Sequence, residues 1–176
     1  MPVLGIIASQ ISGHLFAPSG AYDSIATVSL SGGSSSSISF TSIPSTYKHL
    51  QLRITGLSTA ADGVLNLNGN NANYSHLLYG DGATTSSAAY ASQGYIDAGN
   101  GAGTYPSVYV IDILDYADTN KYKTVRDLFG YDFNGSGRVG MNSMGYNTTS
   151  AVTSLSLTGR TWGQYSSFAL YGIRGN

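Results

Sequence analysis

The stretch that decides the fold is Tyr47-Lys-His-Leu-Gln-Leu-Arg-Ile-Thr55. Within it, Leu50, Leu52 and Ile54 alternate with polar residues, at the period of a β-strand that is buried on one face. The same alternation recurs in residues 26–30, 38–40, 65–68 and 155–157. Turn-forming residues separate these stretches about every ten residues, a spacing that is typical of a sandwich or a barrel. The sequence therefore predicts short strands that each turn one face toward a core.

The composition excludes an ordinary helical protein. Of 176 residues, 8 are basic and 9 acidic, so 10% are charged, whereas soluble domains average about 25%. Every acidic residue is an aspartate, and the chain has no glutamate to fill exposed helix faces. Its 23 glycines and 14 tyrosines favour turns and strands instead. We therefore predict an all-β fold, an antiparallel, jelly-roll-like β-sandwich of about ten to twelve strands.

The stretch Val108–Tyr116 differs from the other expected strands because it is apolar on both faces. One face presents Val108, Val110 and Leu114, and the other presents Tyr109, Ile111 and Ile113. A strand with this pattern is expected at the centre of a sheet, covered on both sides. It is followed by a turn rich in Asp and Asn and then by residues 121–133, which we expect to pair back as a hairpin. Asn134-Gly135 then predicts a tight turn into residues 138–146.

The first 20 residues stand apart from the regular alternation. We predict an extended N-terminal arm in residues 1–20 and a single sandwich domain in residues 21–176. The arm contains the apolar side chains Val3, Leu4, Ile6 and Ile7. Its apolar run is too short to cross a bilayer, and because no basic residue precedes it, we expect mature protein rather than a signal peptide. Either the protein's own sheet or a neighbouring subunit is expected to cover this segment.

Composition and spacing argue against most ligand classes. The net charge is −1 and the pI about 6.2, which gives no basic surface for nucleic acid or an anionic membrane. The chain has no cysteine, and its histidines, His14, His49 and His76, lack the paired spacing of a zinc site. Asp112 and Asp115 fall on opposite faces of one strand, so they cannot act as a pair of catalytic carboxylates. We therefore expect no enzyme, no metal and no cofactor.

One region is open to two interpretations. Tyr90, Tyr95 and Tyr105 lie around a glycine-rich region within residues 83–105. Tyrosine together with Ser, Gly and Asn is the composition of adaptable binding surfaces. Tyrosine is also a good strand former, so the same residues can be structural. The sequence leaves a ligand or partner loop and ordinary strands as alternatives here.

Several segments resemble a family of virion proteins of tailed bacteriophages. In chain order they are Phe40-Thr-Ser-Ile-Pro44, Tyr47-Lys-His-Leu-Gln-Leu-Arg53, Asn73-Tyr-Ser75 with Tyr79-Gly-Asp-Gly82, Ile111-Asp-Ile-Leu-Asp-Tyr116, Thr119-Asn-Lys-Tyr-Lys-Thr-Val-Arg126, and Phe168-Ala-Leu-Tyr-Gly-Ile-Arg-Gly175. The resemblance rests on the order and spacing of these segments, and it extends over residues 22–175. No catalytic motif is among them, so the resemblance transfers no active-site residue.

The resemblance implies a jelly-roll-like sandwich on the virion surface, either decorating the capsid or forming part of a fibre. The chain departs from a fibre protein in its short length and its apolar arm, which stands where a long attachment region is expected. We therefore expect a capsid decoration or cement protein that binds the major capsid protein and its own copies, as a homotrimer. Val3, Leu4, Ile6 and Ile7 are the expected docking contact. The alternative is a fibre or spike adhesin that holds a host glycan with its loops in residues 83–105.

Overall fold

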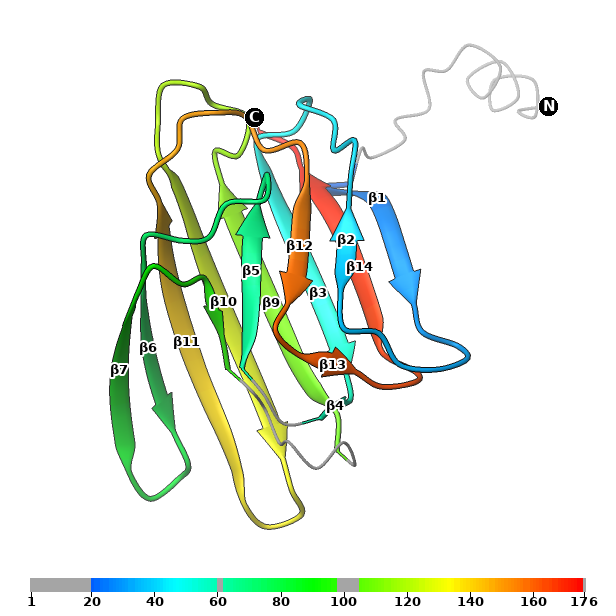
Figure 1. The fold of residues 1–176 in the computed structure, drawn as a ribbon, viewed down its shortest axis with the longest axis vertical. Helices are drawn as coiled ribbons and strands as arrows, with labels where there is room; N and C mark the ends of the chain where they lie inside the picture. The colour runs from blue at the N-terminus through cyan, green and yellow to red at the C-terminus, as the bar shows by residue number, and fades with distance from the viewer. Residues whose placement is uncertain (1–19, 60–61, 98–104, 176) are drawn as a thin grey trace, which may run out of the picture.

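The computed structural model describes residues 20–59, 62–97 and 105–175. These residues form fourteen strands and no helix (Figure 1). The strands are β1 (Tyr22–Ser29), β2 (Ile38–Phe40), β3 (His49–Gly56), β4 (Ser58–Thr59), β5 (Gly63–Leu67), β6 (Tyr74–Gly80), β7 (Thr85–Ala91), β8 (Tyr95–Ile96), β9 (Ser107–Leu114), β10 (Lys123–Asp132), β11 (Gly137–Tyr146), β12 (Leu155–Thr158), β13 (Thr161–Trp162) and β14 (Ser167–Ile173). The expected arm residues Val3, Leu4, Ile6 and Ile7 lie outside the described part of the chain.

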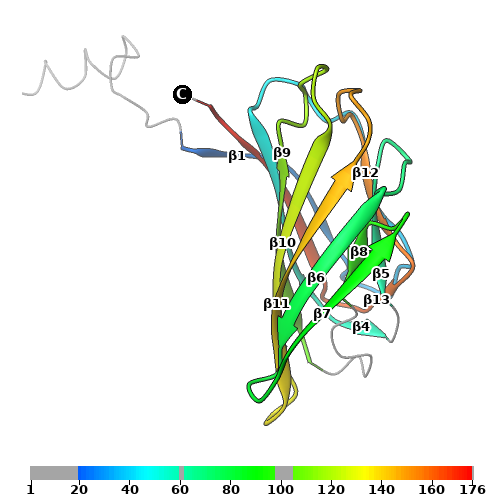
Figure 2. The same ribbon diagram turned by 90° about the vertical axis from the view of Figure 1, so that its left-hand side faces the viewer.

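The strands form two packed antiparallel layers of unequal size. The large sheet has eight strands in the order β1-β14-β3-β9-β10-β11-β6-β7. A smaller sheet, β2-β12-β5-β8, and the pair β13-β4 lie against one face of it, as the edge-on view in Figure 2 shows. The chain passes repeatedly between the two layers, so the predicted all-β sandwich is confirmed. The strand number exceeds the prediction because β4, β8 and β13 have only two residues each, too few to show alternation.

The core lies between the two layers and is built by the predicted alternation. Leu50, Leu52 and Ile54 of β3 are at most 2% exposed. The facing small sheet contributes buried leucines from β5 and β12, namely Leu65, Leu67, Leu155 and Leu157. At one end of the sandwich, the Trp162 ring meets Phe168 edge to face with a centroid distance of 5.0 Å. Aromatic pairs prefer this geometry because the edge of a ring is electropositive and its face electronegative.

The two predicted hairpins are confirmed. Strand β10 pairs with β9 on one side and with β11 on the other, both antiparallel. Asn134 and Gly135 connect β10 to β11 with φ angles of 64° and 117°. Positive φ at both central positions matches the right-handed twist of the flanking strands, and Asn and Gly adopt it at little cost.

The prediction for β9 is half right. The strand is central, between β3 and β10. Its inner side chains, such as Tyr109 and Ile111, are at most 1% exposed, but Val108 is 52% and Val110 37% exposed on the outer face. Cover on both faces is therefore wrong for the described part of the chain. The small sheet covers one face only, and an antiparallel sheet can leave its other face in solvent.

Gly172 in β14 illustrates a requirement set by packing. A Cβ at this position would lie 2.2 Å from the ring of Tyr47. The aromatic ring occupies the space above the glycine, so β14 needs a residue without a side chain here. Gly32, in contrast, has open space around it and no positive φ.

We predict that Gly172→Ala lowers the free energy of unfolding by about 1–3 kcal/mol, because the new methyl group must displace the Tyr47 ring. Gly32→Ala is the matched control and should change stability by less than about 0.5 kcal/mol. Urea denaturation of the two variants measures both values. Equal effects would show that the Tyr47–Gly172 contact does not constrain the strand.

Candidate functional site

The outer face of the large sheet contains a cluster of exposed apolar side chains, which we call the outer stripe. Its six members are Leu78 of β6, Val108 and Val110 of β9, Leu128 of β10, and Val139 and Met141 of β11, each between 37% and 67% exposed. Single exposed apolar residues are common on soluble proteins, but a contiguous group marks an interaction surface. The outer stripe is therefore the candidate functional site.

Strand register makes the outer stripe continuous. Leu128 lies opposite Val110 on one side and opposite Met141 on the other. Met141 in turn lies opposite Leu78. These four side chains form one row across four adjacent strands, which are about 4.8 Å apart.

The surface around this row is hollowed on both sides. One hollow has a volume of about 480 Å³, and its lining includes the row together with Arg126, Asp112 and His76. A second hollow, of about 520 Å³, is lined by Leu78, Leu128 and Met141 together with Val139 and Gly80. Gly130 and Gly80 lie on either side of Val139 on the neighbouring strands. Because they have no side chains, they deepen the second hollow. The row is thus a ridge between two hollows.

A polar row borders the outer stripe on the side of the first hollow. Register places Gln51, Asp112, Arg126, Ser143 and His76 next to one another on adjacent strands. Gln51 donates its Nε2 hydrogen to Asp112 Oδ1 at 2.8 Å. It also accepts a hydrogen bond from Arg53 Nε at 2.7 Å. Hydrogen bonds therefore fix this border on its β3 side.

Arg126 is the exception in the polar row. It lies opposite Asp112 in the register, yet the two side chains form no salt bridge. Within the described ranges, no other side chain forms an ion pair or a hydrogen bond with it either. Arg126 is exposed, so its guanidinium group stands free at the edge of the apolar ridge.

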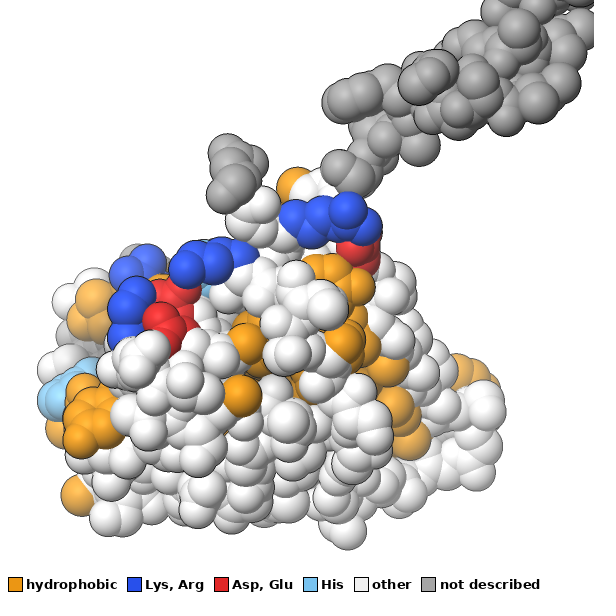
Figure 3. All heavy atoms as spheres, turned by 90° about the horizontal axis from the view of Figure 1, so that it is seen from above, with side chains coloured by type: hydrophobic (Ala, Val, Ile, Leu, Met, Phe, Trp, Pro, Cys, Tyr) orange, Lys and Arg blue, Asp and Glu red, His pale blue; other side chains and the backbone are white. Residues whose placement is uncertain are grey.

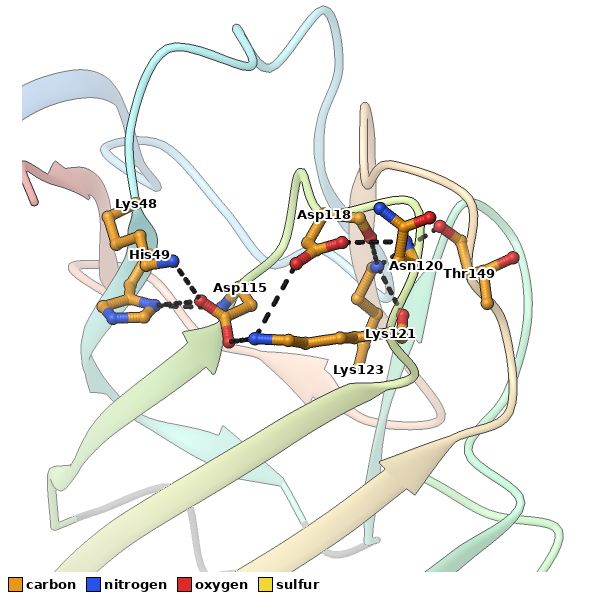
Figure 4. Close-up of polar contacts among 8 residues, drawn as sticks. All are labelled: Lys48, His49, Asp115, Asp118, Asn120, Lys121, Lys123 and Thr149. Atoms are coloured by element: carbon orange, nitrogen blue, oxygen red, sulfur yellow. Dashed lines mark hydrogen bonds and ion pairs between the residues drawn. The ribbon is translucent and has the colours of Figure 1, made fainter.

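A second polar group lies at one end of the sandwich, where charged side chains gather (Figure 3). Its centre is Asp115, in the turn after β9 (Figure 4). The Lys48 ammonium lies 3.0 Å from Asp115 Oδ1, and the Lys121 ammonium 3.3 Å from Oδ2. Chiefly through Lys48, these cations hold the pKa of Asp115 below its ordinary value. His49 accepts a hydrogen bond from the Asp115 backbone N–H at its Nδ1, over 2.9 Å.

Lys123 shows that this end of the molecule serves the fold. Its side chain is 1% exposed, and its Nζ donates to the backbone carbonyls of Asp118, Lys121 and Thr149 (Figure 4). A buried ammonium satisfied by three carbonyls closes the β9–β10 turn and ties it to the segment before β12. The contacts of Lys123 are therefore structural.

A third polar group is buried between the sheets. Arg160, which is 2% exposed, donates from Nη1 to the Tyr109 hydroxyl at 2.8 Å and from Nη2 to the Ile96 carbonyl at 3.3 Å. Asp97 forms an ion pair with Arg138 at 2.7 Å. These contacts join β8, β9 and β11 to the segment after β12. They stabilise the interior, because a buried charge is tolerated only when it is paired and hydrogen-bonded.

Asp127 is the unsatisfied member of this interior group. It is 1% exposed, and neither of its carboxyl oxygens has a hydrogen-bond partner within the described ranges. Its cross-strand neighbour Asn142 also has an unpartnered Oδ1. Burial raises the pKa of Asp127 to about 8, against the opposing effect of the Arg160 charge. The carboxyl group is therefore largely protonated at neutral pH.

The structure separates most of the side chains that the sequence suggested for a site. Asp112 borders the outer stripe, whereas Asp115 belongs to the charged end. Among the residues that the structure describes, no three His, Cys, Asp or Glu side chains gather as a group that could hold a metal ion. None of the elements in this part of the chain is a helix long and apolar enough to cross a membrane.

The three tyrosines suggested for a ligand loop do not form one surface. The rings of Tyr90 and Tyr95 stack at a centroid distance of 4.0 Å, and Tyr95 is 5% exposed. Tyr105 lies instead beside Phe133, 6.2 Å between ring centroids. Part of residues 83–105 forms the strands β7 and β8 rather than loops, and residues 98–104 lie outside the description.

The outer stripe was missed by reasoning from sequence, although one signal for it existed. The two-sided apolar pattern of β9 predicts cover on both faces, whereas in the structure one of these faces is exposed. Leu128, Val139 and Met141 gave no comparable signal. Comparison of the chain with protein families, with curated proteins and with solved structures finds no match.

We predict that the stability of the protein falls as the pH rises from about 4 to about 8. The folded state holds the Asp127 proton more tightly than the unfolded state does, so deprotonation favours unfolding between the two pKa values. Asp127→Asn replaces the titrating carboxyl group by an amide of the same shape. The variant should therefore lack roughly 2–5 kcal/mol of the pH-dependent loss of stability. Urea denaturation at several pH values measures the effect.

Asp112→Asn provides the matched control, since Asp112 lies on the outer face of the same sheet. This variant keeps the buried Asp127 carboxyl and should therefore retain the loss of stability that Asp127 causes. An identical slope in wild type and Asp127→Asn would contradict the assignment.

Proposed function

We propose that this chain is a structural, non-catalytic virion protein that decorates a capsid shell. The observation that supports this function best is the outer stripe. Six apolar side chains left half-exposed on an antiparallel sheet are a liability for a protein that works alone, because such surfaces associate. They suit a protein that functions within an assembly.

The low charge of the chain supports the same proposal. With 10% charged residues, the surface has few of the charges that keep sheet edges and faces apart in free monomers. Several of these charges pair with one another within the chain, as in the Asp97–Arg138 pair and the Asp115 group. The resemblance to tailed-phage virion proteins supports the location on a virion. It also suggests the partners, which are the major capsid protein and two further copies of this chain in a homotrimer.

The arm is the proposed capsid contact. Val3, Leu4, Ile6 and Ile7 supply apolar side chains without a single charged residue in the first 19 positions. Burial of such side chains against a shell is favourable in proportion to the apolar area removed from water. Under this proposal the arm attaches each copy to the particle, and the sandwich lies on the shell surface.

A second candidate, an adhesin that binds a host glycan, is favoured by one observation. A hollow of about 370 Å³ is lined by Asn70, Asn71, Asn73, Asn147 and Thr148 together with Tyr146. Amide and hydroxyl groups of this kind can hydrogen-bond to sugar hydroxyls. This hollow differs from the tyrosine region that the sequence suggested for the same function.

We predict that Ile6→Asp lowers the number of copies bound per capsid at least tenfold, because a charge replaces an apolar side chain in the contact. Gln10→Asp adds the same charge at a polar position of the arm and should bind as wild type does. Copies are counted by quantitative gel analysis of purified particles. Wild-type occupancy by Ile6→Asp would contradict the role of the arm.

The two candidate functions predict opposite results with host cells. A decoration protein should leave host cells unstained when labelled protein is applied at about 1 μM, whereas an adhesin should stain them. Asn147→Ala should abolish staining by an adhesin, since it removes an amide from the hollow. Staining by the wild type that Asn147→Ala abolishes would contradict the decoration function and support glycan binding.

A further inference from the structure

We infer that the outer stripe is a contact between two copies of this chain, which pack their large sheets outer face to outer face around a twofold axis. The inference goes beyond the proposed function, since it concerns the purified protein alone. It would join two neighbouring copies, or two trimers, on a particle. Three properties of the described surface favour a second copy over an unrelated partner.

The first property is shape. A twofold contact needs a surface that is complementary to itself. The ridge formed by Val110, Leu128, Met141 and Leu78 lies between two hollows of about 480 and 520 Å³. A twofold axis that runs across the strands, on the Val139 side of the ridge, would seat the ridge of each copy in the second hollow of the other, with Leu128 over Gly130 and Leu78 over Gly80. Two sheet faces that interdigitate in this way pack about 10 Å apart.

The second property is charge. Arg126 and Asp132 both lie on the outer face of β10, one at each edge of the apolar surface. Asp132 accepts hydrogen bonds from the backbone N–H groups of Asn134 and Gly135, and neither Asp132 nor Arg126 has an ion-pair partner within the described ranges. With the axis across the strands on the Val139 side of the ridge, Arg126 of each copy comes to lie opposite Asp132 of the other, because the two residues are equally far from that axis along β10. The surface thus contains both members of each pair that the contact requires, as self-association demands.

The third property is size. Stable protein interfaces bury about 800 Å² on each partner. Six side chains that are each only about half exposed can form the centre of such an interface but little more. We therefore expect a weak dimer, with a Kd of about 10 μM, that becomes fully occupied where copies are concentrated.

The test is sedimentation of the full chain from about 1 to about 500 μM. The wild type should shift from monomer to dimer over this range. Met141→Asp, at the centre of the ridge, should raise the Kd at least tenfold. Tyr122→Asp adds the same charge at a residue that is 63% exposed outside the outer stripe, and should associate as wild type does.

A charge exchange distinguishes the proposed contact from general loss of association. In Arg126→Asp two acids face each other across the contact, and in Asp132→Arg two bases do, so each variant alone should stay monomeric. Mixed in equal amounts, they should form a heterodimer, because every acid then faces a base. Circular dichroism of each variant verifies that it is folded.

The inference is overturned if the wild type stays monomeric throughout the range, or if Met141→Asp associates as strongly as wild type. It is also overturned if the mixed charge variants fail to associate. These outcomes are separate from the capsid measurement, in which Ile6→Asp tests the arm. A protein that dimerises but does not bind capsids would retain this contact and lose the proposed function.

Discussion

The rest of the structure depends on the unequal size of the two sheets. Eight strands form one layer, and the opposing layer, with four strands and the β4–β13 pair, covers a single face of it. The apolar side chains of that face are removed from water, and their burial is the dominant favourable term in folding. The opposite face has no second layer in the described part of the chain. Its exposed apolar row is therefore a direct consequence of the architecture.

The two faces of the same strands consequently have different tasks. In β10, Val125 and Phe129 pack in the core while Leu128 projects outward between them. A substitution on the inner face changes packing and stability, whereas one on the outer face changes association. This separation allows the outer stripe to serve as a contact surface without disturbing the core.

Charged residues are few, and they lie chiefly inside the molecule or at one end. Arg160 binds backbone carbonyls and the Tyr109 hydroxyl between the layers, and Lys123 closes the β9–β10 turn through three carbonyls. Both side chains fasten segments distant in sequence. Asp127 lacks such partners, which is why burial shifts its protonation and makes the interior sensitive to pH. Few charges then remain for the outer face.

The sequence by itself determined the all-β class, the one-sided strands such as β3, and the β9–β10–β11 hairpins. These features depend on local chemistry: alternation with a period of two, and the positive φ that Asn134 and Gly135 accept. It did not determine β4, β8 and β13, whose two residues pair only because distant segments meet. Nor did it reveal that Gly172 leaves room for Tyr47, or that Arg160 is buried. The outer stripe was likewise decided by tertiary structure, because strand order places Leu78, Val110, Leu128 and Met141 in one row. Alternation shows that a strand has two faces, but only the packing of the whole chain decides which of them is covered.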